Sequence, residues 1–592
     1  MQNDPTPAAR QLSPRRKTTT ATSLAELARE QLAHFHLDPH SPIGAPLLRL
    51  AERLYAAHGD LAELWAATTR ELADLPRGDR LALFNAKKFL TFQLAKLLDT
   101  LQNPTRAVHQ SLGHSAATTL AKGPYPTFDN VAALFSANPV ITRTATYIFA
   151  CTEWIDDAFQ GREFLHEIYS RLLNPTSISL ANHIVEIEAG PLAHEYLAWN
   201  FNSGMAAIDS LLAHLVGYED VVLASRNVYG GTHQLLHDWY GKKSNLNVAV
   251  EFFDGATADD FERALATVRA TYADRLAPAG ARRIYVYLES PCNPHGVFLD
   301  VPAICRSAHA AGLTVILDAT VGTPFLVRPL QESEPAARPD YVIHSYTKDL
   351  VGNGDTTAGV VLGRNADMFL PKGDPGWDHT LFWNVYYIKG AFLDADKAYE
   401  VLSGMKTLEM RMLKKCINTA ILARWLASHP HLSVHGPANP TDPNAPLAAR
   451  LSYLGLPAPL FTIDFEAAGL SRLTFERFFD SLSPMFGHMV SLGQSNTVIL
   501  CPALTSHSEL DPAALRAAGI TPTTIRIAVG DEDPRELIRD FLATARLAID
   551  PDLPGFSARF LPGADVDTLC DHVYLDVHRR HAAAAPRFAT PN

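Results

Sequence analysis

The sequence predicts an α/β fold with a mostly parallel sheet, a helical N-terminal extension and a smaller C-terminal α+β domain. One observation is that, from about residue 140, helical stretches alternate with short apolar runs: VVLAS, RRIYVYLES, LTVILDAT, YVIHS and TTAGVVLG. Such runs, bounded by turn residues and separated by helices, are typical of a parallel sheet covered by helices. The other observation is size, because 592 residues that are 47% hydrophobic suffice for more than one buried core.

The N-terminal part carries helical patterns only. Residues 1–22 are polar and rich in Pro and Thr, which predicts a disordered tail, with an organelle transit peptide as the alternative. Ser23 and Glu26 have the spacing of a capping box, and they precede amphipathic runs that continue to about residue 103. We therefore expect a helical extension and connecting arm over residues 23–139, without a group of residues that carries chemistry.

The remaining boundaries follow changes of pattern. A large α/β domain is expected over residues 140–390, where the apolar runs lie, and a smaller domain over residues 391–550. The smaller domain should begin with one long helix, FLDADKAYEVLSGMKTLEMRMLKKCINTAILARWLA. Residues 551–592 are expected to form a C-terminal extension that ends in a frayed tail, HAAAAPRFATPN.

The composition narrows the class of protein. A net charge of −12 argues against nucleic acid as a partner, because such binding needs a basic surface. No apolar run approaches the roughly 20 residues that span a bilayer, so no membrane partner is expected. The 6 cysteines are scattered without a CxxC pair. This pattern indicates neither a disulfide scaffold nor a metal site, and it fits a cytoplasmic, reducing compartment.

Two ionisable residues follow predicted strands. Lys348 comes shortly after the run YVIHS, and the hydroxyls of Ser345 and Thr347 precede it. Asp318 ends the run TVILD, where a buried carboxylate needs a cationic partner. Each has an ordinary alternative, since Lys348 could be a surface lysine and Asp318 could cap the next turn.

Three further segments add groups that a bound cofactor would need. The Gly204 and Met205 amides open the helical run GMAAIDSLLAHL and would face an anion. Tyr229, beside two glycines, could stack on an aromatic ring, and Asn293 in ESPCNP could reach a phenolic oxygen. Each alone is an ordinary turn or core residue. Together with the lysine and the carboxylate, they are the parts that lysine-bound pyridoxal 5′-phosphate (PLP) requires.

These residues belong to a longer series of segments that resembles the Cys/Met metabolism PLP-dependent enzymes. The series runs in the family's order over roughly residues 140–550: YSRLLNPT (169–176), SGMAAI (203–208), YGGT (229–232), ESPCNP (289–294), HSYTKDL (344–350), GMKTLEMRM (404–412), VSLG (490–493), TSHS (505–508) and GITPTTIRIAVGDED (519–533). The family includes cystathionine γ-synthase, cystathionine lyases, methionine γ-lyase and the O-acylhomoserine sulfhydrylases. The resemblance implies PLP fold type I, the aspartate-aminotransferase-like fold, and leaves the N-terminal helices outside it.

The resemblance implies a role for each matching position. Lys348 would hold the cofactor as a Schiff base and move protons between Cα and Cβ of the substrate, and Asp318 would pair with the pyridine nitrogen. Tyr229 would stack on the ring and assist proton transfer at the leaving group, and Asn293 would contact the cofactor. The phosphate would be bound by Ser345, Thr347 and the amides of Gly204 and Met205, together with Tyr169 and Arg171 from a neighbouring subunit. Substrate contacts would come from Arg526, which would clamp the carboxylate, and from Ser491 and Val490.

Some positions depart from the family's pattern. The usual KYLGGHSD is KDLVGNGD here, so Asp349, Val351 and Asn353 are unusual. The family's DNT becomes DAT at residues 318–320, and the segment after VSLG lacks the usual Glu and His, at Asn496 and Cys501. Lys348 and Asp318 themselves are intact, so these changes bear on the substrate rather than on the reaction class.

The reaction expected from the resemblance is γ-elimination or γ-replacement on a sulfur amino acid or an O-acylhomoserine. A cystathionine γ-synthase or cystathionine lyase is the alternative within the family, and β-elimination or transamination would be other PLP reactions. A catalytically inactive scaffold is the alternative outside enzymes. The presence of Lys348, Asp318 and Arg526 favours an enzyme.

Val490 bears on the substrate, and Tyr169 and Arg171 bear on assembly. Cystathionine-handling members of the family often carry glutamate at the position of Val490, where its charge suits the distal ammonium group of cystathionine. Valine offers that ammonium group no partner. We therefore expect uncharged γ-tails to be preferred, unless Val490 is ordinary packing and another residue contacts the tail. Because the segment with Tyr169 and Arg171 crosses to the partner's site in the family, a homodimer or homotetramer is expected.

Overall fold

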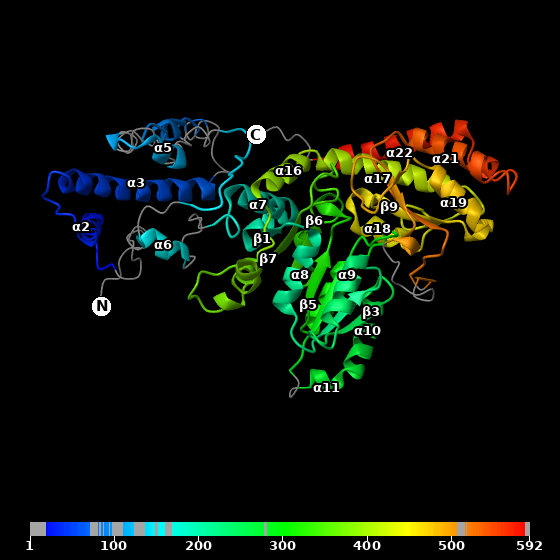
Figure 1. Cartoon of the computed structure of the whole chain (residues 1–592), viewed down its shortest axis with the longest axis horizontal. Helices are drawn as coiled ribbons and strands as arrows, with labels where there is room; N and C mark the ends of the chain where they lie inside the picture. The colour runs from blue at the N-terminus through cyan, green and yellow to red at the C-terminus, as the bar shows by residue number, and fades with distance from the viewer. Residues whose placement is uncertain are drawn as a thin grey trace. The chain divides into compact units, whose positions relative to one another are not determined.

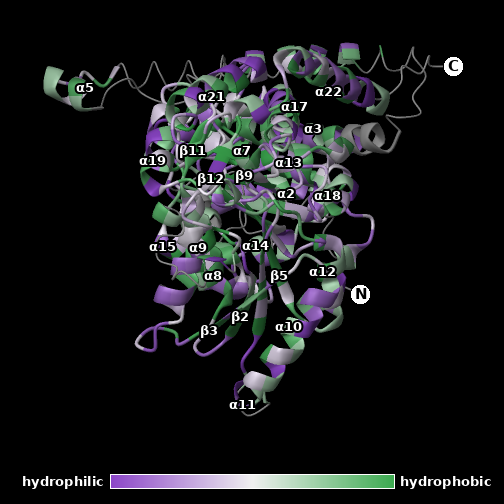
Figure 2. Cartoon of the chain, turned by 90° about the vertical axis from the view of Figure 1, so that its right-hand side faces the viewer, coloured by the Kyte–Doolittle hydropathy of each residue, from purple (hydrophilic) through white to green (hydrophobic). Residues whose placement is uncertain are grey.

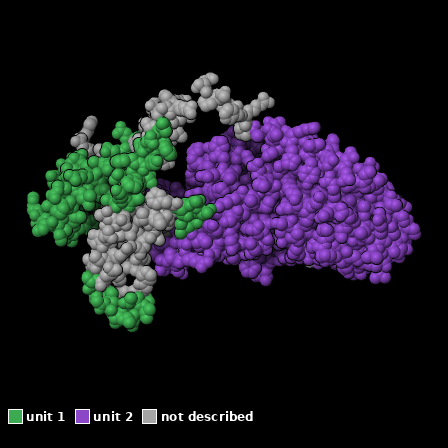
Figure 3. Space-filling view, turned by 90° about the horizontal axis from the view of Figure 1, so that it is seen from above, with its two compact units in different colours: residues 1–140, 148–159 green, residues 141–147, 160–592 purple. Residues whose placement is uncertain are grey.

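The computed structural model describes the greater part of the chain and divides it into two compact units. One unit contains residues 1–140 and 148–159, and the other contains residues 141–147 and 160–592, as Figure 3 shows in green and purple. The described residues are 19–71, 81, 84–86, 88–93, 95–97, 111–122, 136–147, 152–159, 169–277, 281–505, 515–516 and 518–585.

The first unit is helical in its described residues. Its helices are α2 (Leu24–His34), α3 (Gly44–Glu71), α5 (Ala116–Lys122) and α6 (Thr152–Phe159), and the described residues of 81–97 are helical as well. The amphipathic pattern is continuous over the 28-residue α3. Helix α6 groups with this unit although it lies within the residues expected to form the large domain.

The start of α2 differs in detail from the expected capping box and tail. The Ser23 hydroxyl accepts the Glu26 amide, as expected, but the Glu26 carboxylate accepts the amide and hydroxyl of Thr22. The disordered tail predicted for residues 1–22 falls outside the described residues up to residue 18. Beyond it the prediction is wrong, because Ala21 is buried and the Thr19 hydroxyl donates to Glu30 at 2.8 Å.

The second unit is built on a seven-stranded sheet with the order β1-β7-β6-β5-β4-β2-β3. Neighbouring strands from β3 to β6 are parallel, and β7 is antiparallel to both β1 and β6, so the expected mostly parallel sheet is confirmed (Figure 1). The strands are β1 (Tyr196–Phe201), β2 (Val221–Ser225), β3 (Ala249–Phe253), β4 (Ile284–Glu289), β5 (Thr314–Asp318), β6 (Tyr341–Ser345) and β7 (Gly359–Arg364).

Helices cover both faces of this sheet. Val221 and Leu223 of β2 point into one hydrophobic cluster, and the alternate residues Val222 and Ala224 point into another. This burial on both faces explains why the strands read as continuous apolar runs. The longer helices are α7 (Pro175–Ala189), α8 (Gly204–Leu215), α10 (Ala258–Thr271) and α12 (Val301–Ala310); the shorter ones are α9 (Gly230–Gln234), α11 (Ala273–Leu276), α13 (Thr323–Leu326), α14 (Asn365–Met368) and α15 (Tyr387–Lys389).

Amphipathic periodicity sets which side of a covering helix faces the sheet. In α10 the buried residues are Phe261, Leu265 and Val268, spaced by four and three positions. Figure 2 shows hydrophobic and hydrophilic residues alternating along α10 and α12. Among the described residues, no helix combines the length and apolarity that crossing a membrane requires.

The C-terminal part contains a five-stranded sheet with the order β10-β11-β12-β9-β8, antiparallel except for the β10–β11 pair. The strands are β8 (Ser433–His435), β9 (Leu460–Asp464), β10 (Gly487–His488), β11 (Val498–Leu500) and β12 (Thr524–Ala528). The helices are α16 (Ala395–Met405), α17 (Leu408–Leu426), α18 (Ala445–Leu451), α19 (Arg472–Ser481), α21 (Pro534–Ala548) and α22 (Gly563–Ala584).

Two sequence predictions in this part are wrong. The single long helix is broken between α16 and α17, where Thr407 has a non-helical conformation (φ −112°, ψ 9°). The frayed tail also begins later than expected, since α22 continues to Ala584 and buries Cys570, Val573 and Val577. Residues 586–592 of that tail lie outside the described residues.

Candidate active site

A cavity of about 270 Å³ lies where the carboxyl ends of β4, β5 and β6 meet the start of α8 and strand β12. Parallel strands of an open α/β sheet present their carboxyl ends at one edge, where ligands bind. All the site residues predicted from the sequence line this cavity except Tyr169 and Arg171: Gly204, Met205, Tyr229, Asn293, Asp318, Ser345, Thr347, Lys348, Val490, Ser491 and Arg526.

Lys348 lies in the turn that follows β6. Its ammonium group donates to the Ser491 hydroxyl at 2.8 Å. Burial lowers the pKa of Lys348 to about 8; the Arg526 charge lowers it as well, while Asp349 and Asp318 raise it. An amine with this pKa has a much larger neutral fraction near physiological pH than an ordinary lysine, and only the neutral amine can attack an aldehyde.

Asp318 is the last residue of β5 and is buried. One carboxylate oxygen accepts the Thr320 amide at 3.0 Å, and burial raises the pKa of the group. Among the described residues, the groups that act on this carboxylate are Thr320, His344 and Tyr287, and no lysine or arginine forms an ion pair with it. A buried acid without a cationic protein partner fits a ligand that supplies the positive charge, as a protonated pyridine nitrogen does.

The start of α8 approaches the end of β6 closely. Ser203 caps the helix by accepting the Ala206 amide at 3.1 Å, and a Cβ at Gly204 would lie 2.8 Å from the Ser345 Cβ and 2.9 Å from its Oγ. Only glycine permits this approach. The first amides of a helix have no partner within the helix, so the Gly204 and Met205 amides, with the Ser345 hydroxyl, fit a phosphate group. The Thr347 hydroxyl lines the same cavity and is hydrogen-bonded to the Ala358 backbone, at 3.0 Å from its amide and 3.3 Å from its carbonyl.

Arg526, in β12, is 1% exposed. Its Nη2 donates to the Ser491 carbonyl at 2.6 Å and its Nη1 to the Asn293 side-chain oxygen at 3.1 Å. Its Nε has no protein partner, and burial lowers the pKa of the guanidinium to about 10. Among the described residues no carboxylate pairs with Arg526, so the site presents a buried cation to an incoming anion.

The Asn293 and Tyr229 side chains complete the lining. The side-chain oxygen of Asn293 accepts from Arg526, and its side-chain amide is the group that could donate to a phenolic oxygen, as the sequence predicts. Tyr229 is 42% exposed at the cavity, and a Cβ at Gly231 would lie 2.6 Å from its ring. The glycine therefore leaves room for the ring beside the cavity.

Glu289 also lines the cavity, although sequence reasoning did not single it out. One carboxyl oxygen accepts the Tyr229 amide at 2.5 Å and the other accepts the Asn293 amide at 3.0 Å, so this buried side chain joins two loops of the site. Burial, and then the neighbouring Asp318, raise its pKa well above the usual range. Its signal in the sequence is the one that marked Asp318, a carboxylate at the end of an apolar run, and the two are paired in register.

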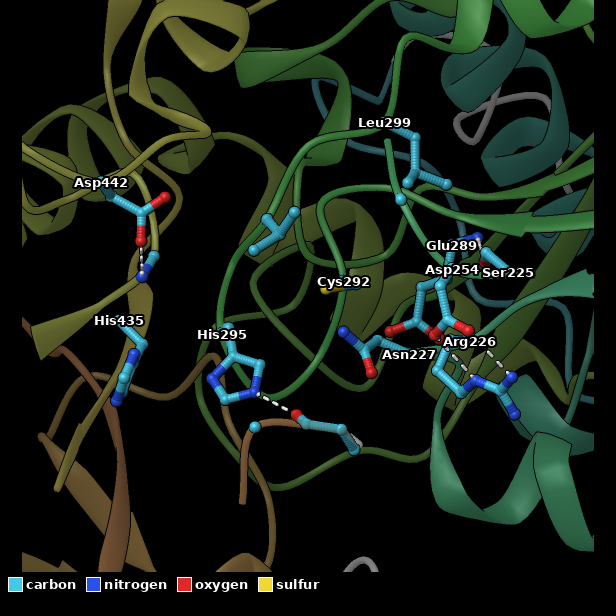
Figure 4. Close-up of a pocket in the computed structure, with 15 residues that line it drawn as sticks. Ser225, Arg226, Asn227, Asp254, Glu289, Cys292, His295, Leu299, His435 and Asp442 are labelled. Atoms are coloured by element: carbon cyan, nitrogen blue, oxygen red, sulfur yellow. Dashed lines mark hydrogen bonds and ion pairs between the residues drawn. The ribbon is translucent and has the colours of Figure 1, made fainter. Parts of the chain in front are cut away.

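Glu289 separates the site from a second cavity of about 380 Å³. Figure 4 shows Cys292, His295 and Asn227 around this second space. Both ring nitrogens of His295 are engaged, at 2.7 Å from the Thr462 hydroxyl and 2.8 Å from the Ala518 carbonyl. Burial raises the pKa of Cys292 to about 12, which makes it an unreactive thiol.

Tyr169 and Arg171 do not line the cavity of their own chain. Arg171 donates to the Tyr387 carbonyl at 2.6 Å, and Tyr169 is 39% exposed. Val490 lines the cavity and is 76% exposed.

A family model described as Cys/Met metabolism PLP-dependent enzyme matches residues 128–545. The chain belongs to this family. It is therefore a PLP-dependent enzyme, and the lysine, the carboxylate and the anion cradle of the cavity fit PLP.

Related proteins of this family include several with stated activities. L-methionine gamma-lyase of Pseudomonas putida is 32% identical over 404 residues, which cover 68% of this chain and 90% of that protein. O-acetyl-L-homoserine sulfhydrylase of Leptospira meyeri is 28% identical over 429 residues, which cover 67% and 90%.

Solved structures of the family confirm PLP fold type I. Cystathionine gamma synthase of Xanthomonas oryzae pv. oryzae aligns with a TM-score of 0.57 at 25% identity, covering 70% of this chain and 94% of that one. A putative O-acetylhomoserine (thiol)-lyase of Campylobacter jejuni aligns with a TM-score of 0.59 at 26% identity, covering 69% and 96%. The latter structure contains N'-pyridoxyl-lysine-5'-monophosphate, in which the cofactor is joined to a lysine.

Proposed function

We propose that this enzyme carries out γ-elimination or γ-replacement on an amino acid with an uncharged γ-substituent, such as methionine, homocysteine or an O-acylhomoserine. The observation that carries the proposal is the buried, unpaired Arg526 guanidinium facing the Lys348 amine across one cavity. An α-amino acid has the matching groups, a carboxylate for the arginine and an α-proton for the lysine. The stated activities of the related proteins support the reaction type.

The chain's own residues have distinct tasks in this proposal. Lys348 holds the cofactor and then moves protons between Cα and Cβ of the substrate, and Asp318 holds the proton on the pyridine nitrogen. When bound, PLP supplies an electron sink for the negative charge that develops at Cα. Tyr229 assists the proton transfer at the leaving group, and Arg526 with Ser491 fixes the substrate carboxylate, so that the α-proton faces Lys348.

Phosphate binding is assigned to the helix start and its neighbours. Within the chain, the phosphate is held by Ser345, Thr347 and the amides of Gly204 and Met205. Asn293 contacts the phenolic oxygen of the cofactor or orients the Arg526 side chain. Tyr169 and Arg171 complete the site of a second copy, which makes the functional unit a homodimer or a homotetramer. Their absence from the cavity of their own chain supports this assignment.

The preference for uncharged tails is assigned to Val490. The side chain is exposed at the cavity, so a valine there gives a distal ammonium group no counter-charge. A cystathionine enzyme is the alternative. We expect a higher kcat/KM for methionine than for cystathionine in the wild type, and a shift toward cystathionine in Val490→Glu. A wild type that already prefers cystathionine would contradict this assignment.

Product analysis tests the reaction itself. Purified holoenzyme given methionine, with and without a second thiol, should release methanethiol and form an α-keto acid and ammonia, or form the replacement product. An amino group passed to a keto-acid acceptor would show transamination instead, and no turnover with any γ-substituted amino acid would favour an inactive relative.

A further inference from the structure

A buried ion pair lies directly beside the proposed cofactor lysine. The Lys415 ammonium group, in α17, lies 2.8 Å from a carboxylate oxygen of Asp349, and the two side chains are 0% and 1% exposed. Asp349 is the residue after Lys348, and it stands at a position where this chain departs from its family's pattern. Burying two charges is costly, so a pair here needs a reason beyond general stability.

The pair joins two turns of the site. Lys415 also donates to the Gln494 carbonyl at 2.7 Å, so one ammonium group holds both the Lys348 turn (residues 346–351) and the 491–494 turn. The second turn carries Ser491, whose hydroxyl accepts from the Lys348 amine.

The two turns are in close contact. Gly493 has a φ of +86°, and a Cβ there would lie 2.5 Å from the Asp349 nitrogen and 2.6 Å from the Lys348 carbonyl carbon. The contact thus leaves no room for a side chain at this position. A small displacement of either turn would move the Lys348 amine relative to Ser491 and Arg526.

The Asp349 carboxylate interacts with several charged and titratable groups besides Lys415. The second carboxylate oxygen of Asp349 is buried without a hydrogen bond. The Asp349 carbonyl accepts from Arg411 at 2.7 Å, and Asp531 and Cys416 are the other titratable groups that interact with Asp349. Lys348 itself faces Asp349, Asp318 and Arg526, so the Asp349 carboxylate is one of two anions that favour its protonated form.

We propose that Asp349 and Lys415 are a positioning pair that holds the Lys348 turn against the 491–494 turn and sets the charge of the Lys348 amine. This inference rests on the proposed role of Lys348 as the cofactor lysine. Neither residue lines the cavity, so the pair acts through Lys348 and Ser491.

The pH dependence of PLP uptake by the apoenzyme tests the electrostatic part, because only the neutral Lys348 amine reacts with the aldehyde. Asp349→Asn should move the midpoint of uptake to lower pH by about one unit, since a carboxylate that favours the protonated amine is removed while Lys415 and Arg526 stay. Lys415→Met should move it to higher pH, since the ammonium group that opposes the Asp349 charge is removed.

Asn418→Ala is the matched control. This buried residue lies on α17 three positions after Lys415, and its amide donates to the Gly530 and Glu532 carbonyls at 3.1 and 2.8 Å. It should lower the thermal midpoint of unfolding and leave the pH midpoint of uptake unchanged. Shifts of the same sign in Asp349→Asn and Lys415→Met, or shifts no larger than that of the control, would overturn the proposal.

The double variant D349N/K415M separates positioning from general stability, and it serves also if a single variant does not fold. Removing both charges should restore much of the thermal stability lost in either single variant, because no buried charge is left unpaired. Its KM for methionine should be severalfold higher than that of the wild type, because the 491–494 turn has lost its anchor. Recovery of a wild-type KM, or no recovery of stability, would overturn the proposal.

Different results would contradict the role of the Asp349–Lys415 pair and the role of Lys348 as the cofactor lysine. A folded wild-type apoenzyme that takes up no PLP would overturn the role of Lys348 and this inference together. Normal uptake in the wild type, with variants that behave as Asn418→Ala does, would overturn this inference alone.

Discussion

Substitution of Arg526 by lysine should weaken catalysis while leaving the cofactor in place. The guanidinium makes two contacts with protein oxygens, at 2.6 Å to Ser491 and 3.1 Å to Asn293, and still presents its edge to the cavity. A lysine keeps the charge but has one nitrogen, so it cannot keep both contacts and also bind a carboxylate through two parallel hydrogen bonds.

The size of the effect follows from the hydrogen bonds lost. One charge-assisted hydrogen bond contributes about 1.5–3 kcal/mol, which corresponds to about 10- to 150-fold in kcat/KM. Steady-state kinetics with methionine in the wild type and Arg526→Lys measures this loss. The visible absorbance of bound PLP and the thermal midpoint of unfolding are the controls, because Arg526 is buried and the variant must be shown to be folded.

A loss below tenfold in a folded, PLP-loaded variant would refute the assignment of Arg526 to the substrate carboxylate. Loss of the cofactor absorbance would refute it in another way, because it would place Arg526 in the cofactor site.

Three further predictions concern the cofactor site. Asp318→Asn should lower kcat by more than tenfold at unchanged folding stability, because a neutral amide cannot hold the proton on the pyridine nitrogen; steady-state kinetics checks this. Gly204→Ala should weaken PLP binding, since its Cβ would collide with Ser345, and fluorescence titration of the apoenzyme measures the dissociation constant. Mixing inactive Lys348→Ala subunits with inactive Arg171→Ala subunits should restore partial activity through one complete hybrid site, and no recovery after confirmed subunit exchange would argue against a shared site.

The seven-stranded sheet could be predicted because the apolar runs in the sequence match the burial of its strands. Strands β4, β5 and β6 are buried on both faces, so their sequences read as apolar runs, and the residues at their carboxyl ends meet at one edge of the sheet. Lys348 and Asp318 could be found from the sequence for this reason. The resemblance supplied Arg526 and Ser491, whose strand and turn are distant from them in the chain.

Other features depend on contacts that a linear sequence does not display. Glu289 ends an apolar run as Asp318 does, but that it joins two loops follows only from its two amide partners. The pairing of Asp349 with Lys415 joins residues 66 positions apart. The break between α16 and α17 occurs at Thr407, in a run that is helical by local pattern.

The central prediction is that Lys348 is the residue that binds PLP. Purified holoenzyme should show a visible absorbance band of lysine-bound cofactor, and reduction with borohydride followed by peptide mass spectrometry should locate the pyridoxyl group on Lys348. In Lys348→Ala the band and the adduct should both be absent. An adduct on another lysine, or a folded wild-type protein that binds no PLP, would contradict the account.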